Sequence, residues 1–180
     1  MINISEQNYH ILFEEKKSIF SEAFKNIKSK KYFQSPYQSF RYRAEFSVIK
    51  VDNVLFYAMT KDGMKEAITS FPIASHKIQI LMSPVLEYIR ENLQLSDKLF
   101  QIEFQSSRNE DAMLTLIYHK DLGEEWIRLA TNLSSNLKVS VIGRSRKQKV
   151  IIGNDYVTET YNYLNEQFSL KLYEQCFSQT

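Results

Sequence analysis

The sequence predicts an α+β fold in which one or two antiparallel sheets pack with about three helices. Segments in which apolar and polar residues alternate outnumber helical segments, and they follow one another as hairpins. The helical segments lie between hairpins and do not alternate with single strands, so repeated βαβ units are not indicated. With 180 residues, 43% of them hydrophobic, the chain is long enough for one domain with a buried core.

The first helix is expected over residues 9–27, where apolar side chains recur at helical spacing. Its other face is rich in lysine and ends in KSKK at residues 28–31. Such a run suits the negative end of a helix dipole and is commonly solvated, and contact with RNA is the alternative.

The stretch FRYRAEF at residues 40–46 alternates aromatic and charged side chains. As a strand, it would place Arg41, Arg43 and Glu45 on one face and turn the residues between them toward the core. The polar face is then either a solvated sheet surface, with the arginines paired to Glu45, or a surface that meets phosphate.

Other segments extend the predicted sheet. Residues 53–60 alternate and lead into Asp62-Gly63, a strong hairpin-turn signal. Residues 98–105 and 111–119 alternate on either side of a polar turn and predict another hairpin. Further strands are expected at residues 137–143, 149–153, 156–164 and 168–175.

Two more helices are expected between these hairpins. Residues 78–93 are apolar at helical spacing, but Pro84 should kink this helix or mark a restart capped by Ser83. Asp121, with Glu124 three residues later, resembles a capping box and predicts where the third helix begins.

The clearest cationic feature is RSRKQK at residues 144–149, between two apolar runs. Because 23 basic residues nearly balance 21 acidic ones, the placement of charge matters more than its total. A basic hairpin tip either keeps the surface solvated or binds phosphate. Together with the arginines of FRYRAEF and many aromatic residues, it favours recognition of single-stranded or loop RNA.

The composition argues against several kinds of site. The single cysteine, Cys176, excludes an intrachain disulfide and a multi-cysteine zinc site, and it indicates a reducing compartment. It has no histidine or glycine turn beside it, so we expect a packing residue and not a nucleophile. The three histidines lie far apart, so no metal is expected, and the four glycines are too dispersed for a nucleotide loop.

No signal peptide and no run of about 18 apolar residues occurs, which predicts a cytoplasmic protein with no membrane partner.

Six segments together resemble, in order and spacing, the N-terminal half of the bacterial tRNA (uracil-5-)-methyltransferases, from about residue 8 to the end. They are FRYRAEF, SFPIAS (70–75), KLFQIEF (98–104), LIYHKDLGEEW (116–126), VIGRSRKQKV (141–150) and CFSQ (176–179). The resemblance implies enzymes that use S-adenosylmethionine to methylate C5 of the T-loop uridine of tRNA. In them a cysteine thiolate adds to C6 of a flipped uracil, and a carboxylate removes the C5 proton.

In that family the N-terminal half recognises the RNA arm, and the C-terminal half is a Rossmann-like methyltransferase domain. The Asp-Pro-Pro and Ser-Cys-Asn-Pro motifs of that second half do not occur here. We therefore expect this chain to lack the methyltransferase domain and to bind S-adenosylmethionine no more than weakly. Residues 1–165 are predicted to form the tRNA-recognition domain, and residues 166–180 to begin the connection to the second domain.

The resemblance also implies a set of site residues. Phe100 and His119 match positions that contact the T arm, although alternation alone would bury Phe100, and His119 could be a polar strand end. Where the family can carry a further arginine, this chain has Ser47. The predicted RNA-binding residues are Arg41, Arg43, Phe100, His119, Arg144, Arg146, Lys147 and Lys149, and the predicted cofactor contact is Gln179.

The leading hypothesis is thus the tRNA-recognition portion of a uracil-C5 methyltransferase, with the T arm as its partner. A stand-alone RNA-binding or tRNA-folding module without catalysis is the alternative. An enzyme that acts on its own through Cys176 is a third hypothesis, for which retained methylation, lost in Cys176→Ser, would be the sign.

Overall fold

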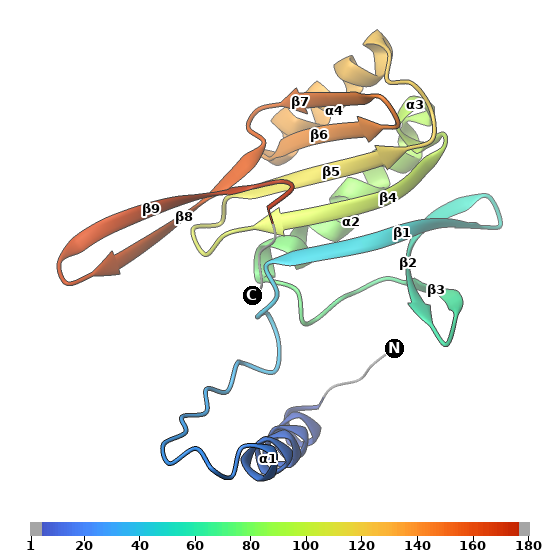
Figure 1. Cartoon of the computed structure of the whole chain (residues 1–180). Helices are drawn as coiled ribbons and strands as arrows, with labels where there is room; N and C mark the ends of the chain where they lie inside the picture. Colours follow the sequence, from blue (N-terminus) through green and yellow to red (C-terminus); the bar gives the residue numbers. More distant parts are fainter. Residues whose placement is uncertain (1–4, 177–180) are drawn as a thin grey trace.

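A computed structural model describes residues 5–176 of the chain. The helices are α1 (Glu6–Ala23), α2 (His76–Glu91), α3 (Leu93–Ser96) and α4 (Glu124–Leu137), and the strands are β1 (Arg43–Val51), β2 (Val54–Lys61), β3 (Met64–Ile68), β4 (Leu99–Ser106), β5 (Ala112–Tyr118), β6 (Ser140–Ser145), β7 (Gln148–Ile152), β8 (Tyr156–Tyr163) and β9 (Glu166–Tyr173). Within the described range, seven strands form one sheet in the order β3-β2-β1-β4-β5-β6-β7, and β8 pairs with β9 alone. Figure 1 shows α2, α3 and α4 behind the large sheet, the β8–β9 hairpin projecting to one side, and α1 lying apart from the sheet.

This arrangement confirms the α+β class, with one difference in strand direction. Strand β6 runs parallel to β5, and the remaining neighbours in the large sheet are antiparallel. The sequence predicted antiparallel pairing throughout. Helix α4 connects β5 to β6, and a helical connection returns the chain to the end of the sheet from which the first strand started. The chain therefore contains one βαβ unit inside a mostly antiparallel sheet.

Helix α2 passes through Pro84 without a break, so the predicted restart at Ser83 is wrong. Its cap is Ser75, whose hydroxyl accepts a hydrogen bond from the Ile78 amide at 3.3 Å. A proline removes the bond to the carbonyl four residues before it, and that residue, Ile80, is exposed, so water can replace the lost partner. The buried face of α2 packs against the sheet on both sides of Pro84 and keeps the helix continuous there. Its residues are Ile78, Leu81, Met82, Val85, Leu86 and Ile89.

Helix α4 begins two residues later than the capping-box interpretation required. Its N-cap is Gly123, and no side chain caps it, so the prediction that Asp121 starts the helix is wrong. The preceding amide of Leu122 is bound instead by the Gln148 side chain of β7, at 2.7 Å. A partner 26 residues away therefore holds the chain just before the helix.

The core lies between the large sheet and helices α2 and α4. Phe46 and Phe104 from neighbouring strands meet with ring centroids 6.0 Å apart, and Tyr57 donates its hydroxyl proton to the Met82 carbonyl at 2.8 Å. Trp126 of α4 packs edge-on against Tyr118, with the centroids 5.9 Å apart. The predicted alternation of FRYRAEF is confirmed for the strand that begins at Arg43, since Ala44 and Phe46 are buried.

Helix α1 forms over much of the predicted segment, but none of its residues is buried. Its aromatic side chains meet the chain that returns toward the sheet: Phe20 lies 6.0 Å from Tyr32 between ring centroids. Tyr9 donates its hydroxyl proton to the Ser35 carbonyl at 2.9 Å. In the described part of the chain, no helix is both long and apolar enough to cross a membrane.

The β8–β9 hairpin is attached to the large sheet at one end. Val157 packs with Met113 and Ile142 on the sheet face opposite the helices, and the Thr158 amide donates to the Asp111 carboxylate at 2.8 Å. The predicted domain boundary at residue 165 falls in the turn between the two paired strands. The division into residues 1–165 and 166–180 stays a prediction.

Candidate nucleic-acid interface

Phe100 is exposed because a β-bulge interrupts the pairing of β4 with β5. Leu99 pairs with Tyr118 and Gln101 with Ile117, so Phe100 is the extra residue between two paired positions. A bulge shifts the alternation by one and redirects a side chain. Leu99 is consequently buried and Phe100 is 40% exposed, which resolves the alternative of core burial for Phe100.

The Phe100 ring packs at a tilt against the imidazole of His119, which follows the end of β5; we call this pair the Phe100–His119 stack. The ring centroids are 4.7 Å apart and the planes are inclined by 55°. On the Phe100 side, the Lys65 ammonium group lies 5.4 Å from the centroid. Lys65 belongs to β3, beyond the Asp62-Gly63 turn. Sequence analysis missed it, because the turn predicts an exposed lysine but does not show which distant ring it approaches.

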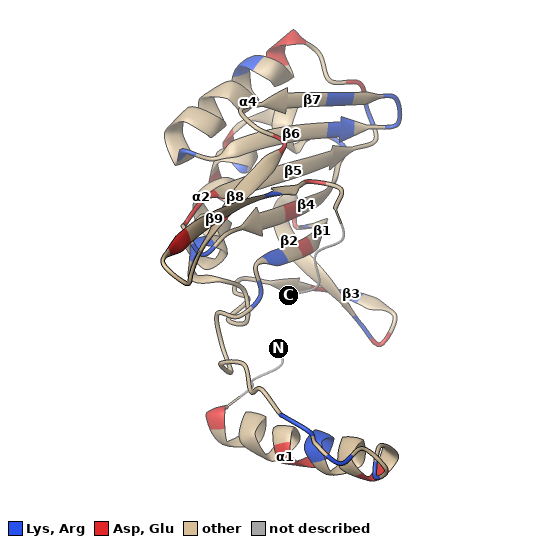
Figure 2. Cartoon of the chain, turned by 60° about the vertical axis from the view of Figure 1, so that its left-hand side comes forward, with Lys and Arg blue, Asp and Glu red and all other residues tan. Residues whose placement is uncertain are grey.

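The basic segment 144–149 divides into two parts. Arg146 and Lys147 form the turn between β6 and β7 and are exposed, and neither makes an ion pair among residues 5–176. Arg144 and Lys149 are cross-strand partners within the hairpin. Figure 2 shows this run of basic residues along β6, β7 and their turn. Ile117 of β5 pairs with Arg144 of β6, and the two strands are parallel. His119 and Arg146 each lie two residues beyond this pair, so His119 and the basic turn are at the same end of the sheet.

Arg43 is bound by two carboxylates on the sheet face opposite the helices. Its guanidinium lies 3.0 Å from Glu45 and 3.2 Å from Glu103 on the neighbouring strand. Burial raises the pKa of the Glu103 carboxyl above its ordinary value and nearby Glu45 adds to this effect, while Arg43 opposes it. Arg41 lies before β1, is exposed, and donates from Nε to the Arg43 carbonyl at 2.9 Å.

Arg144 and Lys149 both contact Glu174, which follows β9. Arg144 Nη1 lies 3.1 Å from one carboxylate oxygen, and Lys149 Nζ lies 3.2 Å from the other. Lys149 also approaches Asp155 at 3.4 Å. These two predicted phosphate contacts therefore already have anionic partners. No local pattern points to Glu174 as their partner, because it is 30 residues from Arg144.

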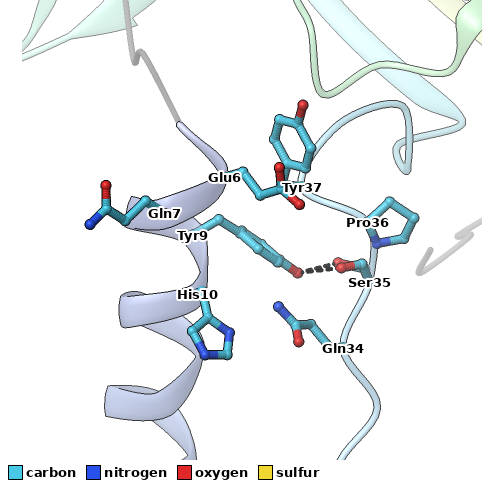
Figure 3. Close-up of a pocket in the computed structure, with 8 residues that line it drawn as sticks. All are labelled: Glu6, Gln7, Tyr9, His10, Gln34, Ser35, Pro36 and Tyr37. Carbon is cyan, nitrogen blue, oxygen red and sulfur yellow. Dashed lines mark hydrogen bonds between the residues drawn. The ribbon is translucent and has the colours of Figure 1, made fainter.

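An open pocket lies between α1 and the segment that returns toward the sheet. It has a volume of about 660 Å³ and is lined by Glu6, Gln7, Tyr9, His10, Gln34, Ser35, Pro36 and Tyr37. Figure 3 shows the Tyr9 hydroxyl directed at Ser35, which is its hydrogen-bonding partner. Among the described residues, no three metal-binding side chains gather in one place.

The described residues contain no glycine-rich loop of the kind that cradles a nucleotide cofactor. The four glycines lie isolated at positions 63, 123, 143 and 153, so no glycine-rich loop follows a strand. The predicted cofactor contact, Gln179, lies outside the described residues. Cys176 is a free, exposed thiol in the turn after β9, so the expectation that it is a packing residue is wrong.

A family model for tRNA (uracil-5-)-methyltransferase matches residues 8–180. The chain belongs to this family. Among its curated relatives, the tRNA/tmRNA (uracil-C(5))-methyltransferase of Acinetobacter baumannii (strain AYE) is 39% identical over 153 residues. The enzyme of the same name from Acinetobacter baylyi is 44% identical over 153 residues. In both cases the match spans 82% of this chain and 42% of the relative.

A solved structure shows that the fold recurs at low sequence identity. The Pyrococcus abyssi tRNA (uracil-54, C5)-methyltransferase, in complex with S-adenosyl-L-homocysteine, superposes with a TM-score of 0.67 at 14% identity. The match covers 96% of this chain and 44% of that one. The α+β fold described above is therefore one that a tRNA (uracil-5-)-methyltransferase can contain within a longer chain.

Proposed function

We propose that this chain is the tRNA-recognition portion of a tRNA (uracil-5-)-methyltransferase and binds the T arm. The observation that supports this most is the exposed Phe100–His119 stack, placed by a bulge at the end of the sheet that also carries the basic turn. Proteins recognise RNA loops by stacking unpaired bases on aromatic side chains and by neutralising the adjacent phosphates. Aromatic rings and basic side chains both occur at this end of the sheet.

The stacked pair and Lys65 would hold an unpaired base of the T loop. A base that stacks on an exposed aromatic ring contributes about 1–3 kcal/mol to binding. The Lys65 ammonium group, 5.4 Å from the Phe100 ring centroid, adds a positive charge beside the ring for the phosphate next to a stacked base. This lysine joins the RNA contacts that the sequence predicted.

Among the predicted phosphate contacts, we assign the leading role to Arg146 and Lys147, which are exposed on the turn. Arg41 is exposed as well. Arg43, Arg144 and Lys149 also stay proposed contacts. At these residues phosphate would have to compete with the carboxylates that already bind them.

We further propose that methyl transfer from S-adenosylmethionine to the T-loop uridine requires residues outside the described part of this chain. The four dispersed glycines support this assignment, and so does the exposed Cys176, whose hydrogen bonds are to Tyr173 and Arg43 and not to a histidine. A thiol becomes a good nucleophile when a base or a positive environment lowers its pKa.

The proposal is tested by titrating a T-arm stem-loop with the chain and following fluorescence anisotropy at several salt concentrations. Binding should weaken linearly on a logarithmic plot of affinity against salt, because phosphate contacts release counterions. An anticodon stem-loop of equal length is the control and should bind more weakly. Absence of binding at low salt, or equal binding of both hairpins at every salt concentration, would contradict T-arm recognition.

A further inference from the structure

We infer that Glu174 anchors the chain segment 174–176 to the open face of the large sheet, with Arg43, Arg144 and Lys149 as its positioning residues. The anchor fixes the direction in which the chain leaves the sheet after β9. The inference does not depend on RNA binding by the Phe100–His119 stack.

The burial of Glu174 is the first observation. Its side chain is 2% exposed although both following residues are exposed. A carboxylate is removed from water at high cost unless cations and hydrogen bonds compensate it. Here Arg144 and Lys149 each contact a different carboxylate oxygen, at 3.1 and 3.2 Å. The backbone is held too, since the Glu174 amide donates to the Asp155 carbonyl at 2.9 Å.

The next two residues are held by the same set of cations. With its amide oxygen turned toward Arg144, Gln175 accepts from both terminal nitrogens of that guanidinium, at 2.7 and 3.2 Å. The Cys176 carbonyl accepts from Arg43 Nη1 at 3.4 Å. Three consecutive residues are thus bound by cations from β1, β6 and β7, three different strands of one sheet face.

The charges on this face favour an anchor over a phosphate site. Three cations lie there, and the carboxylates that contact them are Glu45, Glu103, Asp155 and Glu174. With every carboxylate ionised, the cluster carries no excess positive charge, so it does not attract an anion as a free basic patch does. The cations instead contact the segment that crosses the sheet: Arg144 Nη1 donates a hydrogen bond to one Glu174 carboxylate oxygen, and Lys149 Nζ forms an ion pair with the other, which accepts no hydrogen bond among the described residues.

The lone cysteine provides a reporter for this anchor without any added mutation. A nitroxide attached to Cys176 in the full chain, without RNA, should give a spectrum of restricted motion. Glu174→Gln and Arg144→Gln should each increase the mobility of the label. Hydrogen exchange should show the protection of the Glu174 amide falling by about tenfold, while amides of β5 and β6 keep theirs.

Arg146→Gln is the matched control, because it removes an arginine from the same hairpin outside the anchor. It should leave the spectrum unchanged, and Arg144→Lys should restore part of the restriction, since it keeps the charge but not the forked contact to Gln175. If Glu174→Gln fails to fold, Arg144→Gln decides the question. Unchanged label mobility and unchanged exchange at the Glu174 amide in a folded variant would overturn the anchor, whatever the affinity for the T arm.

Discussion

Replacing Phe100 by alanine separates RNA recognition from folding. Phe100 is 40% exposed, so about three fifths of the ring is buried, and full burial of a phenylalanine contributes about 1.5–3 kcal/mol. The substitution should therefore lower the free energy of unfolding by about 1–2 kcal/mol, which a domain with about 5–15 kcal/mol of stability tolerates. The loss of a stacked base should weaken T-arm binding by about 1–3 kcal/mol, or about 5-fold to 150-fold.

A matched control for this variant exists on the projecting hairpin. Phe168 is 46% exposed and lies on β9, away from the stack, so Phe168→Ala should cost similar stability and leave T-arm affinity unchanged. Both variants are assayed by urea denaturation and by anisotropy titration of the stem-loop at one salt concentration. The reasoning fails if Phe100→Ala binds the T arm like the unchanged chain, or if Phe168→Ala weakens binding equally.

Three further predictions concern charge, pH and packing. Arg146→Gln with Lys147→Gln should reduce the slope of log affinity against log salt by about 1–2 in the stem-loop titration, and an unchanged slope would remove the turn from the interface. The folded chain holds a proton on Glu103 more tightly than the unfolded chain does, because the pKa of this carboxyl is raised on folding. The free energy of unfolding should therefore fall as the pH rises above 4.5, the ordinary pKa of the group. The urea midpoint should fall less between acid and neutral pH in Glu103→Gln than in the unchanged chain. An equal fall in both proteins would contradict the raised pKa of Glu103. A Cβ added at Gly143 would collide with the Trp126 ring, so Gly143→Ala should destabilise the chain by about 1–3 kcal/mol, and in combination with Trp126→Phe the two costs should be less than additive; strict additivity would contradict the contact.

The sequence predicted the hairpins well because alternation and turn chemistry are local signals. The Asp62-Gly63 turn is one case, with both residues at positive φ. The direction of β6 was not predictable in this way, because it depends on how α4 packs across the sheet. Pro84 was misleading for a related reason: burial of one helix face outweighs a single missing hydrogen bond whose acceptor can meet water.

The candidate site was predictable in its residue types and less so in its geometry. Alternation assigns Phe100 to the core, and a bulge of one residue reverses that assignment. Arg144 looked like a free cation at a hairpin tip, but its carboxylate partner comes from a strand end 30 residues later. Pairings between distant segments depend on the three-dimensional path of the chain, which local patterns do not encode.

Mapping the complex by NMR is the most direct test of T-arm recognition by the end of the sheet that carries Phe100, His119 and the basic turn. Backbone amide shifts of the full chain are followed while a T-arm stem-loop is added. The largest changes should occur at Phe100 and His119, at Lys65 and along the turn of Arg146 and Lys147, with little change at the tip of β8–β9. Changes concentrated on the outer surfaces of α2 and α4, with none at Phe100 or His119, would contradict the proposed interface.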